Sequence, residues 1–592
     1  NVLFKTTNYG HSWQEISPDL TTNDKSKQQS SGGPVVVDNT AAEFHCTILA
    51  IAESPIKPGV IWVGTDDGNV QVTQDGGKTW KNVAGNIKGL PANSWVPNID
   101  ASHFDAGTAY VAFDRHQDDD FGPWAFKTTD FGQTWTSIKS DLPAKGYVHV
   151  VREDPKVKTL LYCGTELGIF ASWDGGAHWV SIRNNIPPVA VRDIVVHPRD
   201  NDLIVATHGR GVFILDGAAA LQELATARAN DVFMFDVRQA TRYQMWGKDS
   251  NLGQKTFSAQ NPPAGALIDY YLKADVNGPV VITIADKSGK TIRTIRSNAN
   301  KAGVNRVVWD LRYDPPTPAA GGAPGGGGVG RGGGGGQAAG PAQGRGGAGA
   351  QAGAGAGPSG PGSGDQPAAE EGGGRFGFGG GPSVVPGDYT ITLKASGKQL
   401  SKTVRVGLDP RIKTSDSDLN AQLDAALKLR DLSSTLNNIV ARVDDLTRQL
   451  TALSETMRRV PDPPATAGRA GEGAGDGNST GPVARPAQSD NAATDITAAL
   501  DELKKLRATL VREAPFGYRY PPRLREEVQS LGGSINSAIA PPTESQMLRL
   551  REVTEETQKA VADLNAIIVG PIRRVNEKLS SQPHVVTGSP VR

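Results

Sequence analysis

Side chains able to hold or transform a ligand are concentrated in four short segments of the first 217 residues. The segments are Asp66-Asp67, Asp114-Arg115-His116-Gln117-Asp118-Asp119-Asp120, Glu166 and His208-Gly209-Arg210. Two carboxylates that converge on a glycosidic bond act as general acid and base, and several together bind Ca²⁺. A solvated acidic loop has the same composition. The choice among these three interpretations depends on the elements that carry the segments.

The first 217 residues contain an internal repeat. The turn Ser/Thr-x-Asp-x-Gly-x-x-Trp starts at Thr6, Thr73, Thr128 and Ser172, and its first copy has Asn8 in place of Asp. The carboxylate can accept backbone N–H bonds within the turn, Gly supplies positive φ, and Trp packs between adjacent sheets. We therefore predict structural, non-catalytic roles for Asn8, Trp13, Asp75, Trp80, Asp130, Trp135, Asp174 and Trp179.

Short strands precede each of the last three turns, so each unit reads as strand, turn, strand, turn, strand, Asp turn, strand. This is one four-stranded blade of a β-propeller, which buries its faces against neighbouring blades. Residues 1–217 then comprise the outer half of one blade, three complete blades and the start of a fifth. Propellers close with about four to eight blades. We therefore expect an N-terminal remainder of the propeller, in the same or a separate chain, as a partner.

The four chemically active segments fall in or near the loops that join the second and third strands of successive blades. These loops line the face opposite the Asp turns, and the third blade has the longest one, as functional loops often are. The candidates for ligand contact on this face are Asp66, Asp67, His116, Trp124, Arg152, Glu166, Arg192, His208 and Arg210. If the face is catalytic, Asp114 and Asp119 are the candidate carboxylates. Trp95, Trp124 and Tyr147 are candidates for stacking on sugar rings.

The rest of the chain changes its pattern twice. A helical link (218–230) leads to alternating strands over 231–412, which predict an antiparallel β-sandwich of immunoglobulin-like size with a disordered Gly-rich insertion at 316–383. From 413 to 592 the apolar period is helical and predicts a bundle of four antiparallel helices with a Gly/Pro-rich loop at 460–492. The expected fold is multidomain and mainly β.

Composition excludes several classes of function. Lys plus Arg and Asp plus Glu both number 62, so the balance gives no electrostatic case for nucleic acid or an anionic membrane. No apolar run reaches the ~20 residues that span a bilayer. Cys46 and Cys163 fall in predicted strands and are expected to be buried free thiols. We predict no metal site and no cofactor.

The turns and the blade "GTDDG…TQDGGKTW" resemble the Asp-box (BNR repeat) propellers of sialidases, xyloglucan-cleaving glycosidases and sortilin-type sorting receptors. The chain as a whole looks most like the large secreted sortilin-like or "glycosyl hydrolase" repeat proteins of soil bacteria. The segment "GVNRVVWDLRYDPP…VPGDYTITL" is similar to the Ig-like domain of flagellar hook-capping proteins. The resemblance implies an extracellular or periplasmic location in the bacterial envelope.

The resemblance also implies what an active site would need. Sialidases hold the substrate carboxylate with three arginines, for which Arg152, Arg192 and Arg210 are candidates, and use a Tyr–Glu pair that is not recognisable in this sequence. Xyloglucan-cleaving enzymes set acid and base on two propellers, so this chain would supply one of them, Asp114. We therefore favour a binding scaffold that recognises a glycan or peptide on the propeller face, with a glycoside hydrolase as the alternative.

Overall fold

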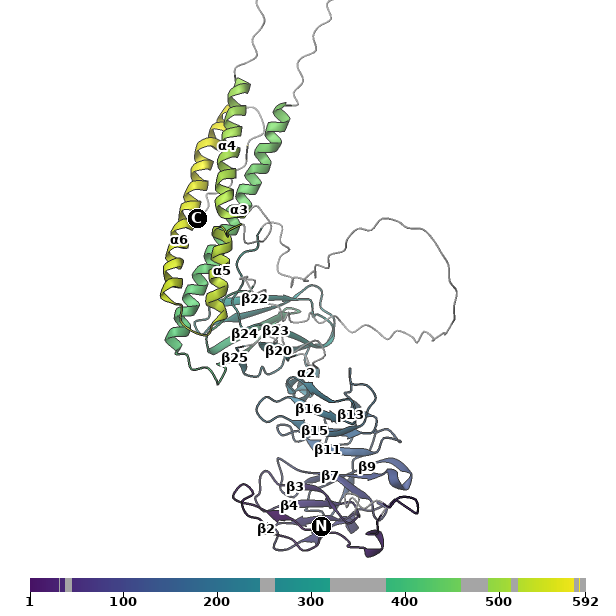
Figure 1. Cartoon of the computed structure of the whole chain (residues 1–592). Coiled ribbons are helices and arrows are strands. Elements are labelled where there is room, and N and C mark those ends of the chain that lie inside the picture. Colours follow the sequence, from purple (N-terminus) through teal and green to yellow (C-terminus); the bar gives the residue numbers. More distant parts are fainter. Residues whose placement is uncertain are drawn as a thin grey trace, which may run out of the picture.

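The computed structural model describes residues 1–30, 32–37, 45–244, 261–319, 380–458, 488–512, 520–579 and 585. Three parts follow one another: a run of small sheets, a two-sheet sandwich and a helical bundle (Figure 1). Most of the Gly-rich insertion predicted to be disordered lies outside the described residues, as does most of the predicted Gly/Pro-rich loop, whose last residues, from Gln488 on, belong to a helix instead.

The first part is β-propeller-like, because four-stranded antiparallel sheets follow one another along the chain. Blade 1 is the pair β1-β2, blades 2, 3 and 4 are β3 to β6, β7 to β10 and β11 to β14, and blade 5 is the triplet β15-β16-β17. In chain order the strands are Phe4–Lys5, Gln14–Glu15, Ile48–Glu53, Ile61–Thr65, Val70–Thr73, Lys81–Asn82, Trp95–Ala101, Ala109–Arg115, Asp120–Thr128, Thr136–Ser137, Val148–Glu153, Leu161–Thr165, Gly168–Ser172, Val180–Ser181, Val191–Val196, Leu203–Thr207 and Val212–Leu215. Three 3₁₀ turns lie between them, η1 (Lys25–Lys27), η2 (Ala84–Asn86) and η3 (His116–Asp118).

Successive blades pack closely because a small residue stands at one repeated position of the second strand. A Cβ on Gly164 of β12 would lie 2.6 Å from the carbonyl oxygen of Val191 in the next blade. Gly64 occupies the same position in β4, where a Cβ would meet Val96 at 2.3 Å. The innermost strands β7, β11 and β15 therefore lie side by side, and their side chains share the space between blades.

The repeated turn forms the hydrogen bonds expected from the sequence. Oδ1 of Asp75 accepts the backbone N–H of Thr79 at 3.0 Å, and the amide oxygen of Asn8 accepts that of Ser12 at 2.9 Å. Trp80 and Trp179 donate from Nε1 to carbonyls of the preceding blade, at Ile16 and Ile138. Trp13 departs from the prediction, because 61 % of its surface is exposed where the equivalent tryptophans pack between sheets.

A short link carries the chain into the sandwich through α1 (Ala219–Gln222) and α2 (Leu224–Arg228). The sandwich has a three-stranded sheet, β18-β20-β23, and a five-stranded sheet, β19-β25-β24-β21-β22, which share one apolar core. Strands β18 to β25 are Val232–Met234, Ala240–Arg242, Ala266–Leu272, Val280–Ala285, Thr291–Ser297, Gly303–Trp309, Gly387–Ala395 and Lys398–Leu408. The prediction of a wholly antiparallel sandwich is wrong at one place, since β19 pairs with β25 in parallel. The immunoglobulin-like topology stays a prediction.

The bundle begins with the long helix α3 (Asp416–Arg458), followed by α4 (Gln488–Leu510), α5 (Leu524–Ser537) and α6 (Glu544–Ile567). A π-helical turn, η5 (Ile568–Ile572), joins α6 to α7 (Arg573–Lys578). The four predicted helices are present, but α4 and α5 lie one after the other along α3 (Figure 1), and α6 packs against all three. The cross-section therefore has three helices. None of the described helices combines the length and apolarity that a membrane span requires.

Both cysteines are free and buried, as predicted. Cys163 lies in β12, and burial raises the pKa of its thiol. The expectation that Cys46 also lies in a strand is wrong. It precedes β3 with φ of 68°, a left-handed conformation that does not fit an extended strand.

Candidate functional site

The structure brings seven polar or aromatic side chains of blades 3, 4 and 5 together on the predicted ligand face. We call this group the face cluster. Its members come from the ends of β8, β11, β12, β15 and β16, or from the residues next to them. They are Asp114, His116, Tyr147, His149, Glu166, Arg192 and His208.

At the centre of the face cluster Tyr147 and Glu166 form a pair. Tyr147 precedes β11 and Glu166 follows β12, so hairpin pairing places them opposite each other, and the Glu166 N–H donates to the Tyr147 carbonyl at 3.1 Å. Burial, together with a hydrogen bond between its hydroxyl and Glu166, raises the pKa of Tyr147 to about 12. The sequence interpretation missed this Tyr–Glu pair.

His149 links Glu166 to Arg192 through its two ring nitrogens. Nε2 lies 3.0 Å from Oε2 of Glu166, and Nδ1 lies 3.3 Å from Nη1 of Arg192. A guanidinium only donates hydrogen bonds, so Nδ1 must be the unprotonated acceptor and Nε2–H donates to Glu166. Arg192 therefore fixes His149 as one neutral tautomer. A second guanidinium nitrogen reaches Nδ1 of His208 at 3.4 Å.

The electrostatics of the face cluster follow from this arrangement. The imidazole of His149 is 2 % exposed. Burial lowers the pKa of His149. The hydrogen bond to Glu166 raises it and the positive charge of Arg192 lowers it, and the pKa stays below its usual value. For Glu166, partial burial raises the pKa, but the hydrogen bonds from His149 and Tyr147 outweigh it and leave the pKa below its usual value. Glu166 is thus an anion whose acceptors are engaged within the protein.

The aromatic rings expected to stack on sugars are covered by protein. His116 stacks on Tyr147 with ring centres 4.9 Å apart, and His149 meets the same ring edge-on. In β9, Trp124 lies under the ammonium of Lys139 at 4.6 Å and beside Phe126. Trp95 is half-buried in β7. Phe121, whose ring centre is 6.4 Å from that of Tyr147, is 44 % exposed.

The carboxylates of the acidic loop are mostly engaged inside the loop. Arg115 pairs with Asp118 at 3.0 Å and with Asp120 at 3.2 Å. Asp114 is buried, and its Oδ1 accepts the backbone N–H of His116 at 3.0 Å and lies 2.7 Å from Nδ1 of that ring. Asp114 therefore orients His116. Asp119 lies exposed at the tip of the loop with φ of 58°.

Asp66 and Asp67 are buried and hold neighbouring segments in place. Asp67 accepts hydrogen bonds from the backbone and hydroxyl of Thr22, at 2.6 and 2.8 Å, and from Thr65. Asp66 accepts the N–H of Thr47 at 2.7 Å and lies 3.6 Å from His45. These two predicted ligand contacts are thus in use as structural acceptors. Across the described ranges, no group of three His, Cys, Asp or Glu side chains is arranged to hold a metal ion.

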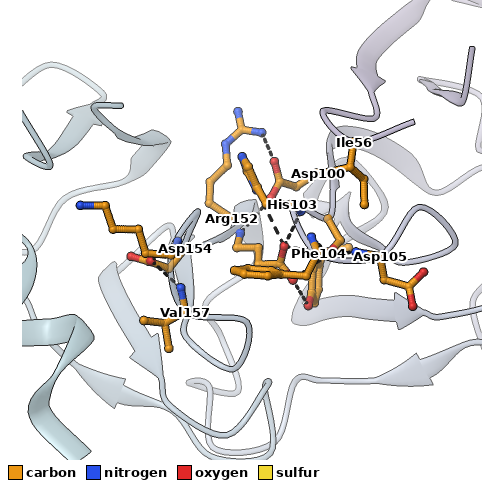
Figure 2. A network of polar contacts seen from close by, with 12 residues as sticks. Ile56, Asp100, His103, Phe104, Asp105, Arg152, Asp154 and Val157 are labelled. Atoms are coloured by element: carbon orange, nitrogen blue, oxygen red, sulfur yellow. Dashed lines mark hydrogen bonds and ion pairs between the residues drawn. The ribbon is translucent and has the colours of Figure 1, made fainter. Parts of the chain in front are cut away.

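Arg152 lies away from the face cluster, in a network that joins the innermost strands of three blades. Its guanidinium binds Asp100 of β7 at 3.1 Å and Asp193 of β15 at 2.9 Å, and Figure 2 shows it pointing to Asp100. The next residue, Glu153, is a buried carboxylate that accepts bonds from Ser102, His103 and Tyr110. These donors are Ser102 Oγ at 2.8 Å, His103 N at 2.7 Å and Tyr110 Oη at 2.9 Å.

Of the predicted face residues, the structure therefore unites Asp114, His116, Glu166, Arg192 and His208, and separates Arg152, Asp66 and Asp67 from them. Arg210 lies exposed in the turn between β16 and β17. His149 was missed by sequence reasoning. A histidine within the apolar strand "VHVV" was the available signal.

No protein-family model matches this chain, and no curated protein matches it. Among solved structures, an ancestral GH74 enzyme aligns at 14 % identity and a TM-score of 0.25, over 50 % of this chain and 35 % of that one. YCF48 bound to D1 peptide aligns at 14 % identity and a TM-score of 0.22, over 42 % of this chain and 68 % of that one. The GH74 xyloglucanase from Xanthomonas campestris aligns at 11 % identity and a TM-score of 0.27, over 52 % of this chain and 43 % of that one.

This chain thus spans about a third of the ancestral GH74 enzyme that it matches. The β-propeller-like character of the first part follows from its own strand order, described above, and the site is interpreted from its own geometry.

Proposed function

We propose that the chain is a secreted or periplasmic binding scaffold that captures a peptide on the face cluster. The observation that carries this proposal is that Arg192 has imidazole partners and no carboxylate partner among the described residues. Its guanidinium contacts one ring nitrogen each of His149 and His208, at 3.3 and 3.4 Å, and among the described residues it forms no ion pair with a carboxylate. The face cluster therefore presents one guanidinium without a carboxylate partner, while its own carboxylates, Asp114 and Glu166, are engaged by His116, His149 and Tyr147.

The neighbouring Arg152 differs from Arg192 in its partners. Arg152 stands on the neighbouring innermost strand and is neutralised by two carboxylates, Asp100 and Asp193. Arg192 is oriented by the two imidazoles alone, its charge is not balanced by a carboxylate ion pair among the described residues, and the residue is exposed. A guanidinium with free donors recognises a carboxylate in a bidentate manner. An acidic side chain or a chain-terminal carboxylate of the ligand fits this position.

The aromatic side chains favour a peptide over a glycan. Sugar recognition by stacking needs an open ring face, whereas Tyr147 is covered by His116 and Trp124 by Lys139. Phe121, which is not one of the rings expected to stack on sugars, is exposed beside the face cluster; an apolar peptide side chain can pack on it, and the glycan array tests whether a sugar ring does. The ligand class we propose is therefore a peptide that joins a carboxylate to an apolar residue.

The test is a pair of arrays, one of peptides and one of glycans, probed with the full chain and with Arg192→Gln. We expect peptides rich in Asp, Glu or free C-termini to bind the wild type and to lose binding to Arg192→Gln. The control Arg199→Gln removes an exposed arginine of the same blade that pairs with Asp200 and should bind as the wild type does. Binding confined to glycans, or binding indifferent to Arg192→Gln, would contradict the proposal.

A second candidate function is glycoside hydrolysis, and the Tyr147–Glu166 pair favours it. Glycosidases with a tyrosine nucleophile exist beside those with two carboxylates, and Glu166 lies opposite Tyr147 across the β11-β12 hairpin, where its N–H donates to the Tyr147 carbonyl at 3.1 Å. The high pKa of Tyr147 is against an activated nucleophile. If reducing ends are released from a polysaccharide panel, Tyr147→Phe and Glu166→Gln should each abolish release, as should Asp114→Asn if that carboxylate takes part. Activity that survives the first two substitutions would exclude this pair.

A further inference from the structure

The two imidazoles that contact Arg192 differ in what they leave free for a ligand. The ring of His149 is 2 % exposed, and its second nitrogen, Nε2, is occupied by Glu166 at 3.0 Å. His208 is exposed, and among the described residues its Nε2 has no hydrogen-bond partner. Of the two imidazoles on Arg192, His208 is therefore the one that a bound ligand can reach.

Backbone hydrogen bonds hold His208 in this place. Its N–H donates to the carbonyl of Ala190, just before β15, at 2.9 Å. Thr207 closes the turn, because its N–H and its hydroxyl both donate to the carbonyl of Gly211, at 3.1 and 2.6 Å. A Cβ on Gly209 or Gly211 would meet no atom within 4 Å. The space over the turn is therefore open to a ligand.

The charged groups beside His208 are positive in the free protein. Nη2 of Arg192 lies 3.4 Å from Nδ1 of His208, and a guanidinium only donates hydrogen bonds, so this contact requires an unprotonated Nδ1. Arg210 lies exposed in the same turn. Across the described ranges, His208 forms no ion pair with a carboxylate. Without a ligand, nothing on this side of the face cluster favours a proton on the ring.

The remaining titratable groups of the face cluster are held by one another. Oδ1 of Asp114 lies 2.7 Å from Nδ1 of His116, and Glu166 is engaged by His149 and Tyr147. Burial lowers the pKa of His149, which keeps that ring neutral over more of the acid range. A carboxylate for the exposed imidazole must therefore come from a ligand.

We propose that Arg192 and His208 bind the carboxylate of the peptide together, and that His208 takes up a proton from solvent as the peptide binds. This inference rests on the proposed function and adds to it a second ligand contact and a dependence on pH. The bound carboxylate balances the charge of Arg192 and accepts a hydrogen bond from the imidazolium, so it favours the charged ring. Because linkage is reciprocal, the proton then tightens the binding of the peptide, and affinity rises as pH falls.

The test measures affinity by fluorescence anisotropy at pH 7.5 and pH 5.5, about one unit on either side of the usual pKa of histidine. The probe is the acidic peptide selected on the array, and the protein is the full chain. The wild type should bind about three- to tenfold more tightly at pH 5.5, since one proton changes affinity by at most about tenfold per pH unit. His208→Asn keeps an oxygen acceptor for Arg192 but cannot take up a proton, and it should lose most of this rise.

The matched control is His178→Thr, which removes an exposed histidine of the repeated turn in blade 4. Thr79 and Thr134 occupy the same place in blades 2 and 3, so the variant should fold and keep the full rise. Calorimetry in two buffers of different ionisation enthalpy counts the protons directly. We expect a net uptake of up to about one proton by the wild type and much less by His208→Asn.

The outcomes separate this inference from the proposed function. Equal affinity at both pH values, weaker binding in acid, or a rise that persists in His208→Asn would overturn the role of His208 and leave that of Arg192 standing. If no acidic peptide binds the wild type at either pH, the proposed function fails and this inference fails with it. Position 208 is exposed, so His208→Asn is compatible with folding, which its unfolding midpoint verifies.

Discussion

Nη1 of Arg192 lies 3.3 Å from Nδ1 of His149, and this contact decides where the proton of the imidazole resides. The opposite nitrogen faces Glu166 at 3.0 Å. His149 therefore bridges Arg192 on β15 and Glu166, which follows β12. Protonation of Nδ1 would replace an acceptor by a donor and set two positive groups against each other. The face cluster is therefore built around a neutral histidine.

The first prediction concerns the titration of His149. Nitrogen NMR should show a neutral ring protonated on Nε2, with a pKa below the usual value for histidine because of burial and Arg192. Arg192→Gln removes a neighbouring positive charge and should raise that pKa, while Arg199→Gln should not. A folded pKa below the unfolded one means that the unfolded chain binds more protons as pH falls below about 6.5. His149 should therefore lower the stability of the fold in acid, and a ring protonated on both nitrogens at neutral pH would contradict this account.

His103 should have the opposite effect on stability. Its Nδ1 lies 3.8 Å from Glu153, and this carboxylate raises the pKa of His103 against the effect of burial. A raised folded pKa gives stability that is complete below about pH 6.5 and is lost as pH rises through the folded value. The difference in urea-unfolding free energy between wild type and His103→Gln should thus shrink from pH 5.5 toward pH 8.5, values chosen as about one to two units on either side of histidine's usual pKa. A constant difference would show that the contact is not ionic.

Glu153→Gln should be strongly destabilising, because it removes a buried anion that three donors share. Hydrogen bonds to charged groups contribute about 1.5 to 3 kcal/mol each, so we expect a loss of about 3 kcal/mol in the free energy of unfolding. Glu53 occupies the same register position in blade 2 and is exposed. Glu53→Gln is therefore the matched control and should change stability by less than about 0.5 kcal/mol. Similar losses for both variants would refute the role of the network.

The repeated turn gives a graded prediction. Oδ1 of Asp130 accepts the N–H of Thr134 at 2.9 Å, and Oδ2 accepts its hydroxyl at 2.6 Å. Asp130→Ala should lower the free energy of unfolding by about 1 to 2 kcal/mol. Asp130→Asn should lower it by less, since Asn8 makes the same backbone hydrogen bond in blade 1. Peptide binding to the face cluster should be unchanged in both, whereas a loss of binding in folded Asp130→Asn would reopen a functional role for the turn.

Much of the first part was predictable from sequence because its determinants are local. The spacing from Thr73 to Trp80 specifies a turn by side-chain hydrogen bonds within eight residues, and the turns fix the period of the strands. The Tyr147–Glu166 pair was also within reach, because the two residues flank the ends of one hairpin. Recognising it required the register of β11 on β12, which composition alone does not give.

Other features depend on contacts between distant segments and could not be predicted. The same acidic residue type is buried at Asp67, held by Thr22, and exposed at Asp119, although both follow a strand in a similar loop. The parallel pairing of β19 with β25 joins residues more than 160 positions apart. The arrangement of α4 and α5 one after the other along α3 depends on helix lengths. The helix α3 has 43 residues, so it is long enough to pack against α4, with 23 residues, and α5, with 14, in succession.

The central claim is that Arg192 is the cationic anchor for a peptide ligand, and one affinity measurement tests it most directly. Fluorescence anisotropy would compare one acidic peptide selected on the array, with free and with amidated C-terminus, on wild type, Arg192→Gln and Arg199→Gln. Loss of a charge-assisted contact should weaken binding to Arg192→Gln by about 10- to 100-fold, with Arg199→Gln unaffected, and the amidated form would tell a terminal from a side-chain carboxylate. Equal affinity of the peptide for all three proteins would contradict the account.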